Sequence, residues 1–283
     1  LSKSASKKKK DQFVVAYLPD LDKTQACLDY ALQFAKILDK GLILLHISDD
    51  SLTQITTEQA EKRLKEINES LPEDVFHSYV ALKGKSESVL NAIGELLNAV
   101  LTVVCCDSES KDKKKADHPQ TLLRNLASSR TAYLVCSAQS RPQEYEKVVL
   151  TLNHLSESKE KTLWASYLGR FAQSDIVLYY RRYKDEYYQK QLNLNIAFAR
   201  KMFAKFGIEI ETKHSLDTKT KLDLQALEYA EKENCNLIIC QTTKNKTFVD
   251  MLTGLDEVKV LKQIKNIPIL FLNPREDLFI LCE

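Results

Sequence analysis

The chain has 283 residues, which is enough for one large domain or for two domains of about 140 residues. Its 41 basic and 39 acidic residues give a formal net charge of +2, a balance that argues against the strongly basic class of nucleic-acid and membrane-surface proteins. The longest apolar runs have the length of strands and fall short of the ~20 residues that cross a bilayer. We therefore expect a globular protein with neither a membrane nor a nucleic acid as its partner.

Residues 1–11 include the lysine-rich run LSKSASKKKK and lack the apolar segment of a secretory signal. We interpret them as a disordered leader or a cloning remnant, with a basic nucleic-acid arm as the alternative. The seven cysteines show no CxxC spacing, which indicates a reducing, cytoplasmic compartment. Because Cys105, Cys106, Cys136 and Cys240 lie in apolar runs, we expect them to pack as small hydrophobic side chains. The five histidines show no metal-binding spacing, and we expect no metal site.

The first half of the chain alternates between strand and helix patterns. Apolar, β-rich runs predict strands, and apolar positions at helical spacing, such as Leu28, Ala31 and Leu32, predict helices. Gly41 is expected to end the first helix as a C-cap glycine. In chain order we expect strands at residues 13–18, 42–47, 75–82, 100–106 and 132–136, and helices near residues 28–38, 56–70, 89–97 and 120–129.

The second half follows the same plan, and its strands lie about 135 residues after their counterparts. Gly207 is expected to cap its second helix. The pattern predicts domains at residues 12–138 and 146–283, the second with a C-terminal tail, joined by the polar segment 137–146. We expect strands at residues 147–152, 176–180, 208–213, 237–240 and 269–272, and helices near residues 164–171, 185–206, 219–233 and 258–264.

The first strand, helix and second strand read VVAYLPDLDKTQACLDYALQFAKILDKGLILLHIS. This run resembles the universal stress protein family, which has a YALxLA helix followed by an LxLLHV strand, and the resemblance extends from Gln12 to Asn273 in tandem form. It implies an α/β fold of the adenine nucleotide alpha hydrolase-like class. In this fold, two tandem five-stranded parallel sheets, each in the order 3-2-1-4-5, would carry helices on both faces. Many members of the family bind ATP between the first and fourth strands.

Members that bind nucleotide carry the motif G-x2-G-x9-G-[ST] after the fourth strand, where glycines let the backbone close on the phosphates. In the second half the four positions fall on Gln241, Lys244, Gly254 and Leu255, so that one glycine remains. In the first half they fall on Cys106, Glu109, Pro119 and Gln120, and none is kept. The sequence therefore predicts that both ATP motifs have degenerated.

Two functional hypotheses follow. The leading one is a non-enzymatic stress-response or regulatory protein, without catalytic residues or cofactor, that acts through protein–protein surfaces. The alternative is a sensor of an adenine nucleotide or another small ligand in the second domain. The resemblance places the base-contacting position of that site on Asn153, and in the first domain on Pro19 or Asp20. The residues that would hold ATP or a related nucleotide are Asn153, Thr242, Thr243, Lys244 and Gly254.

The two fifth strands, at residues 132–136 and 269–272, are apolar edge strands that need a cover. We expect them to pair within one chain as a pseudo-dimer, with a homodimer as a further possibility. The segment Tyr179–Lys190 interleaves tyrosines with basic residues. Such tyrosines either bury their rings and leave the hydroxyl groups in water, or stack on nucleic-acid bases.

Overall fold

The computed structural model describes residues 10–53, 55–127, 129–215, 220–242 and 256–274. Within these residues the first half has strands β1, β2, β3, β4 and β5 and helices α1, α2, α3 and α4. They occupy, in chain order, β1 Phe13–Tyr17, α1 Gln25–Ile37, β2 Gly41–Ser48, α2 Thr57–Ser70, β3 His77–Lys83, α3 Ser86–Leu96, β4 Ala99–Cys106, α4 Pro119–Leu126 and β5 Ala132–Ser137.

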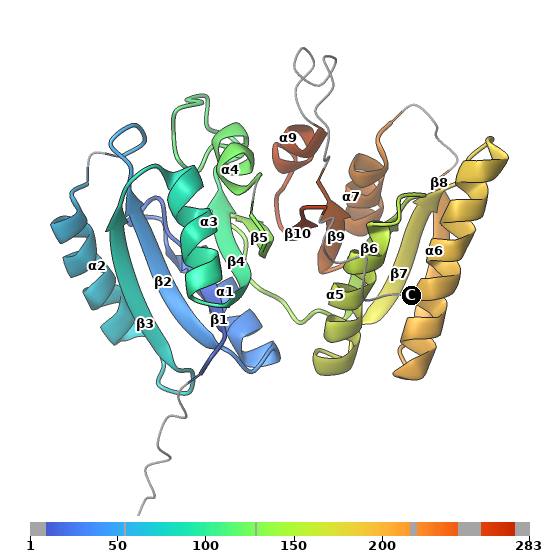
Figure 1. Cartoon of the computed structure of the whole chain (residues 1–283), viewed down its shortest axis with the longest axis horizontal. Helices are drawn as coiled ribbons and strands as arrows, with labels where there is room; N and C mark the ends of the chain where they lie inside the picture. Colours follow the sequence, from blue (N-terminus) through green and yellow to red (C-terminus); the bar gives the residue numbers. More distant parts are fainter. Residues whose placement is uncertain (1–9, 54, 128, 216–219, 243–255, 275–283) are drawn as a thin grey trace, which may run out of the picture.

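The described part of the second half continues this alternation of strands and helices. Its elements are β6 Lys147–Leu152, α5 Ser158–Phe171, β7 Asp175–Arg181, α6 Glu186–Lys205, β8 Ile210–Ser215, α7 Leu222–Lys232, β9 Leu237–Gln241, α9 Asp256–Leu261 and β10 Ile269–Leu272. Figure 1 shows the first half, coloured blue to green, beside the second half, coloured yellow to red. Of the helices in the described residues, none is long and apolar enough to cross a membrane.

The strands form one sheet, in the order β3-β2-β1-β4-β5-β10-β9-β6-β7-β8. The expectation of two separate five-stranded sheets is therefore wrong, although each half keeps the expected order. The pairing of the two fifth strands is confirmed, because β10 runs antiparallel to β5 with Leu270 opposite Leu134 and Phe271 opposite Tyr133. This pairing merges the sheets, since each apolar edge strand satisfies the backbone groups of the other.

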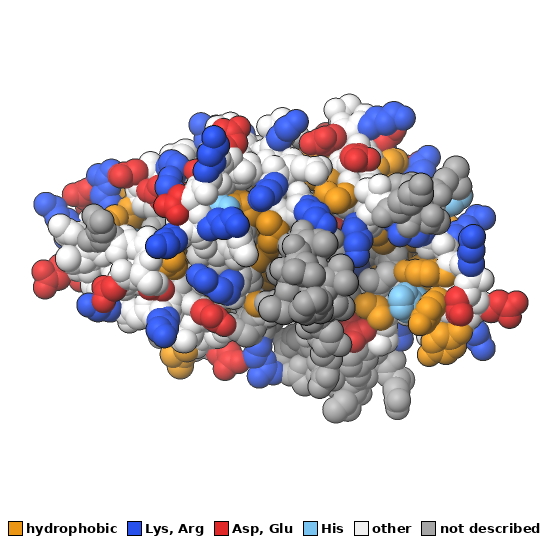
Figure 2. Space-filling view, turned by 90° about the horizontal axis from the view of Figure 1, so that it is seen from above, with side chains coloured by type: hydrophobic (Ala, Val, Ile, Leu, Met, Phe, Trp, Pro, Cys, Tyr) orange, Lys and Arg blue, Asp and Glu red, His pale blue; other side chains and the backbone are white. Residues whose placement is uncertain are grey.

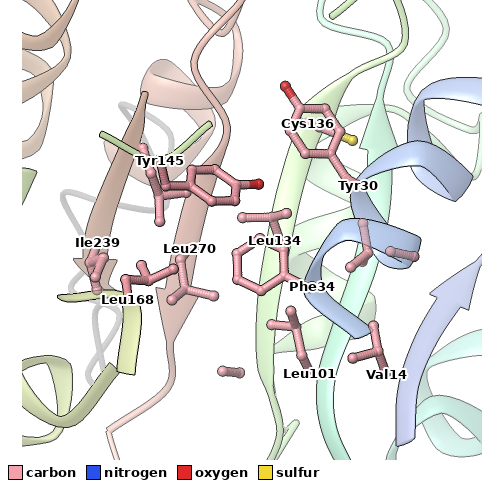
Figure 3. Packing of buried hydrophobic residues seen from close by; sticks show 14 of the residues in the cluster. Val14, Tyr30, Phe34, Leu101, Leu134, Cys136, Tyr145, Leu168, Ile239 and Leu270 are labelled. Atoms are coloured by element: carbon pink, nitrogen blue, oxygen red, sulfur yellow. The ribbon is translucent and has the colours of Figure 1, made fainter. Parts of the chain in front are cut away.

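Apolar side chains cover both faces of the sheet and continue across the junction. One buried cluster lies beneath α1, α2, α5 and α6, and the other beneath α3, α4, α7 and α9. Figure 3 shows the first cluster at the junction, where Leu134 and Leu270 lie between the halves. The connecting segment belongs to the same core, because the buried ring of Tyr145 lies 5.2 Å from that of Phe34, centroid to centroid.

Two glycines illustrate how helices end in this chain. Gly207 follows Phe206, the C-cap residue of α6, and has φ +66°, as expected for a residue that ends a helix in the left-handed conformation. The same expectation for Gly41 is wrong, because Asp39 takes the left-handed conformation, with φ 51°. Gly41 begins β2, where an added Cβ would lie 2.7 Å from ring carbons of Phe13. Close approach, rather than helix capping, therefore requires this glycine.

Candidate functional site

A cavity of about 500 Å³ opens at the carboxyl ends of β6 and β9. These are the first and fourth strands of the second half, between which an open α/β sheet has its crevice. Helices α5, α7 and α9 contribute side chains to its wall. The lining residues that matter below are Thr151, Asn153, Glu157, Lys161, Arg181, Tyr183, Lys221, Asp223, Gln241, Thr242 and Glu257.

A buried ammonium group forms the inner end of this cavity. Lys161 lies on the inner face of α5 with 2% of its surface exposed, and its Nζ donates a hydrogen bond to Thr151 Oγ1 at 3.2 Å. Burial lowers the pKa of Lys161, and the nearby carboxylate of Asp223 opposes this effect. Burial raises the pKa of Asp223, which Lys161 in turn lowers and the charge of Glu257 raises further. The inner wall therefore holds a cation and carboxylates that compensate one another.

Gln241, the last residue of β9, is a second unusual group in the wall. The residue is 9% exposed, and among the described residues neither its amide nitrogen nor its amide oxygen has a hydrogen-bond partner. Buried polar atoms of this kind are rare in folded proteins, and each costs free energy until a partner reaches it. An unsatisfied donor and acceptor in the wall of a cavity are therefore groups that a polar ligand can satisfy after a small side-chain rotation.

Aromatic rings gather beside the mouth of the cavity. The ring of His154 lies 4.9 Å from that of Tyr183 and 4.4 Å from that of Tyr188, centroid to centroid. Arg181 projects from the end of β7 and donates a hydrogen bond to the carbonyl oxygen of Thr220. Burial lowers the pKa of His154. Of the five tyrosines in residues 179–190, Tyr179, Tyr180 and Tyr183 are buried or half-buried, in agreement with the structural interpretation of that segment, whereas Tyr187 and Tyr188 are 65% and 43% exposed.

The residues expected from sequence to hold a nucleotide are only partly brought together. Asn153 and Thr242 both line the cavity, whereas Thr243, Lys244 and Gly254 lie outside the described residues. Asn153 Oδ1 accepts hydrogen bonds from the backbone of Leu155 at 3.0 Å and from Ser158 Oγ at 2.7 Å. This oxygen organises the turn that precedes α5 and is already occupied.

Thr242 is also engaged within the protein, since its Oγ1 donates to Asn273 Oδ1 at 2.6 Å.

Sequence reasoning missed Lys161, Asp223 and Glu257. The available signal was the position of Lys161 in α5, where neighbours on the same face, such as Ala165 and Leu168, are apolar and buried. A lysine on the buried face of a helix requires a partner in the interior.

The corresponding cleft of the first half is almost closed. Its cavity measures about 10 Å³ and is bounded by residues that include Tyr17, Asp20, Cys27 and Cys105. The loop after β4 folds back over this end, because the backbone of Asp107 donates to Asp117 O at 2.9 Å. A space of this size holds about one water molecule. The two halves thus share a strand order but differ in the volume of their clefts.

In the described residues, no cluster of three or more histidine, cysteine, aspartate or glutamate side chains is arranged to hold a metal ion. Basic and acidic side chains are interspersed over the face shown in Figure 2. Such a mixed surface does not resemble the basic stripe of a nucleic-acid-binding protein.

No protein-family model and no curated protein match this chain. Several solved structures do match this chain. A universal stress protein from Archaeoglobus fulgidus matches with a TM-score of 0.69 and 11% identity, over 94% of this chain and 100% of that one. A functionally unknown protein from Pseudomonas aeruginosa PAO1 matches with a TM-score of 0.62 and 15% identity, over 96% of this chain and 95% of that one. At these identities the likeness establishes the fold.

Proposed function

We propose that this chain, which has the fold of the universal stress proteins, is a regulatory protein without catalytic activity that binds a small polar ligand in its second half. Stress response is the role that the names of similar structures suggest. The residue ranges 12–138 and 146–283 would act as its two domains, held as a pseudo-dimer by the β5–β10 pair. The chain would thus combine a stress-response role with ligand sensing, and only the cleft of the second half would act as the sensor.

The observation that carries this proposal is the difference between the two clefts. The second-half cavity measures about 500 Å³, within the range of small-molecule sites, whereas the first-half cavity measures about 10 Å³. Ligand pockets are usually preformed and carry a few convergent polar groups. Gln241, with its unsatisfied amide, and Lys161, with its buried ammonium, provide such groups.

The charges in the cavity disfavour a triphosphate. Three basic side chains among its described lining residues are matched by three carboxylates: Lys161, Arg181 and Lys221 against Glu157, Asp223 and Glu257. Carboxylates near a phosphate chain repel it and must be desolvated together with it. The side chain of Gln241 also stands where nucleotide-binding relatives are expected to have their first glycine. We therefore infer a ligand of low net charge that carries both donors and acceptors.

Native mass spectrometry of the purified chain, combined with calorimetric titration of adenosine and of ATP with magnesium, tests the proposal. We expect a bound small molecule to accompany the protein, or adenosine to bind with greater affinity than ATP. Tight binding of ATP with magnesium would refute the charge argument. An empty protein that binds neither compound would refute the ligand proposal.

A Gln241→Met variant locates the site, because methionine preserves the volume and removes both polar atoms. It should abolish ligand binding and, in the ligand-free protein, raise the free energy of unfolding by about 1–3 kcal/mol. Gln120→Met is the matched control, since Gln120 is exposed at the start of α4. The control should bind and unfold like the parent protein.

A second candidate function is self-association, which the outer face of α5 favours. Leu163, Tyr167 and Phe171 recur on this helix at a spacing of four residues and are 41%, 45% and 51% exposed. An exposed apolar row of this kind is typical of an interface, and we assign a second copy of this chain to it. Light scattering across a range of concentrations would show a dimer that Tyr167→Ser weakens. A concentration-independent monomer would exclude it.

A further inference from the structure

Three thiols meet beneath the closed cleft of the first half. Cys27 comes from α1, Cys105 from β4 and Cys136 from β5, and all three are buried in the cluster that contains Leu134. Figure 3 shows Cys136 at the edge of this cluster, close to Tyr30. Neither the cavity of the second half nor the proposed ligand uses these groups.

Cys105 and Cys136 are placed for a bond between their sulfur atoms. They lie opposite each other in the parallel pair β4–β5, and their Sγ atoms are 3.2 Å apart. Paired residues on neighbouring strands have backbones about 4.8 Å apart, which falls within the Cα separation that a disulfide spans. The neighbouring Cys106 belongs to the cluster on the opposite face of the sheet. Only a small rotation of the two side chains therefore separates the thiol pair from a disulfide.

The surroundings favour Cys105 as the group that reacts first. Hydrogen bonds from the thiols of Cys136 and Cys27 hold the pKa of Cys105 well below its usual range. Burial raises the pKa of both neighbours. Cys27 Sγ also lies 3.3 Å from the carbonyl oxygen of Val103, and Cys136 Sγ 3.5 Å from that of Val104, so each thiol hydrogen can point either to a carbonyl oxygen or to Cys105. These contacts keep the outer two thiols protonated around a central sulfur.

A small cavity lies next to this sulfur, which also keeps a little exposed surface. Cys27 and Cys105 both line the space of about 10 Å³ at the end of β1, and Cys105 is 7% exposed. Such a volume admits a molecule close to water in size. Hydrogen peroxide has two oxygen atoms and needs only a small widening of this space, whereas a glutathione molecule or a protein thiol would need a far larger one.

We propose that Cys105 and Cys136 form a reversible disulfide when hydrogen peroxide reaches the closed cleft of the first half. The Cys105 thiolate attacks one peroxide oxygen, the O–O bond breaks, and the departing hydroxide takes up a proton to give water. The resulting sulfenic acid at Cys105 is attacked by the sulfur of Cys136, which forms the S–S bond and releases a second water. Two electrons pass from the thiols to the peroxide, and both thiol protons leave in the water molecules.

The bond would join β4 to the strand that connects the two halves. Cys136 lies on β5, beside the Leu134–Leu270 and Tyr133–Phe271 pairs of the junction. Closing the chain between residues 105 and 136 restricts the unfolded state and so stabilises the folded one. The oxidised chain should therefore unfold at a higher temperature than the reduced chain. This inference does not depend on a ligand in the second half.

Peptide mapping tests the proposal. The reduced full-length chain is exposed to hydrogen peroxide, its remaining thiols are alkylated after unfolding, and the digest is analysed by mass spectrometry without reductant. We expect a linked pair of peptides that contain Cys105 and Cys136, lighter by two hydrogens, which dithiothreitol separates. Cys136→Val should abolish the link, and Cys106→Ser should retain it.

Three results would overturn the assignment. The first is complete alkylation of the peroxide-treated chain at both positions, which requires no variant and so does not depend on how a variant folds. The second is irreversible oxidation of Cys105 without a link. The third is a disulfide in the parent protein that involves Cys106, or one that joins Cys105 to Cys27 instead of to Cys136.

Discussion

The side chain of Asn273 connects the two halves of the molecule, and its removal should weaken their junction. Asn273 follows β10, and its Nδ2 donates to the carbonyl oxygens of Leu126 at 2.7 Å and of Ser129 at 2.9 Å. Its Oδ1 accepts from Thr242 Oγ1 at 2.6 Å and from the Tyr133 hydroxyl at 3.4 Å. The amide therefore joins the end of α4 and the strand β5 to the end of β9.

The effect of Asn273→Ala can be worked out from these contacts. Thr242 keeps an acceptor, because its Oγ1 also lies 3.4 Å from Leu272 O. Three hydrogen bonds are lost, to Leu126 O, to Ser129 O and from the Tyr133 hydroxyl, although Leu126 O keeps a hydrogen bond from Ser129 N at 3.0 Å and the Tyr133 hydroxyl keeps Thr242 beside it. At about 1 kcal/mol for each of these three hydrogen bonds, the variant should lose about 3 kcal/mol of unfolding free energy. A measured loss of unfolding free energy between about 2 and 4 kcal/mol would agree with the removal of three hydrogen bonds.

Urea unfolding followed by two probes measures this loss. Trp164, the single tryptophan, lies on α5 and reports on the second half by fluorescence, while far-ultraviolet circular dichroism reports on both halves. We expect the midpoints to coincide in the parent protein and to separate in Asn273→Ala. Asn193→Ala is the control, since Asn193 is exposed on α6. A loss below about 0.5 kcal/mol, with coincident midpoints, would refute the proposed role of Asn273.

Two further predictions concern buried charges. Lys161→Met should cost about 1–3 kcal/mol, because it leaves the half-buried carboxylate of Asp223 without a neighbouring cation. Lys161→Met combined with Asp223→Leu should recover most of this loss in urea unfolding. Equal losses in the single and double variants would contradict the pairing. Burial lowers the pKa of His46 below its usual 6.5. Unfolded chains then bind more protons than folded ones below about pH 6.5, so stability is lost as the pH falls toward the folded pKa. The melting temperature should therefore fall between about pH 7.5 and about pH 5, and it should fall less in His46→Asn. An equal fall in the variant would exclude His46 as the source of the loss.

Much of the fold follows from the order of apolar residues along the chain. Alternating strand and helix patterns predict a parallel sheet because parallel strands need a crossover helix. The pairing of the fifth strands was also predictable, since Ala132–Cys136 and Ile269–Leu272 are apolar edges that need a cover. Gly207 was correctly predicted to cap a helix, whereas Gly41 was not, because its role depends on the ring of Phe13, which approaches from another strand.

The sequence alone determined that each half is an α/β unit whose strands follow the order 3-2-1-4-5, since local periodicity and the family resemblance carry that information. Tertiary structure decided that the ten strands form one sheet, because the antiparallel register of β5 and β10 depends on how the two halves pack against each other. It also decided which cleft is open. Lys161 is one of many lysines in the sequence, and only the packing of α5 against β6 and β9 makes it a buried ammonium beside Asp223. Burial and charge compensation depend on three-dimensional neighbours that come from distant parts of the chain.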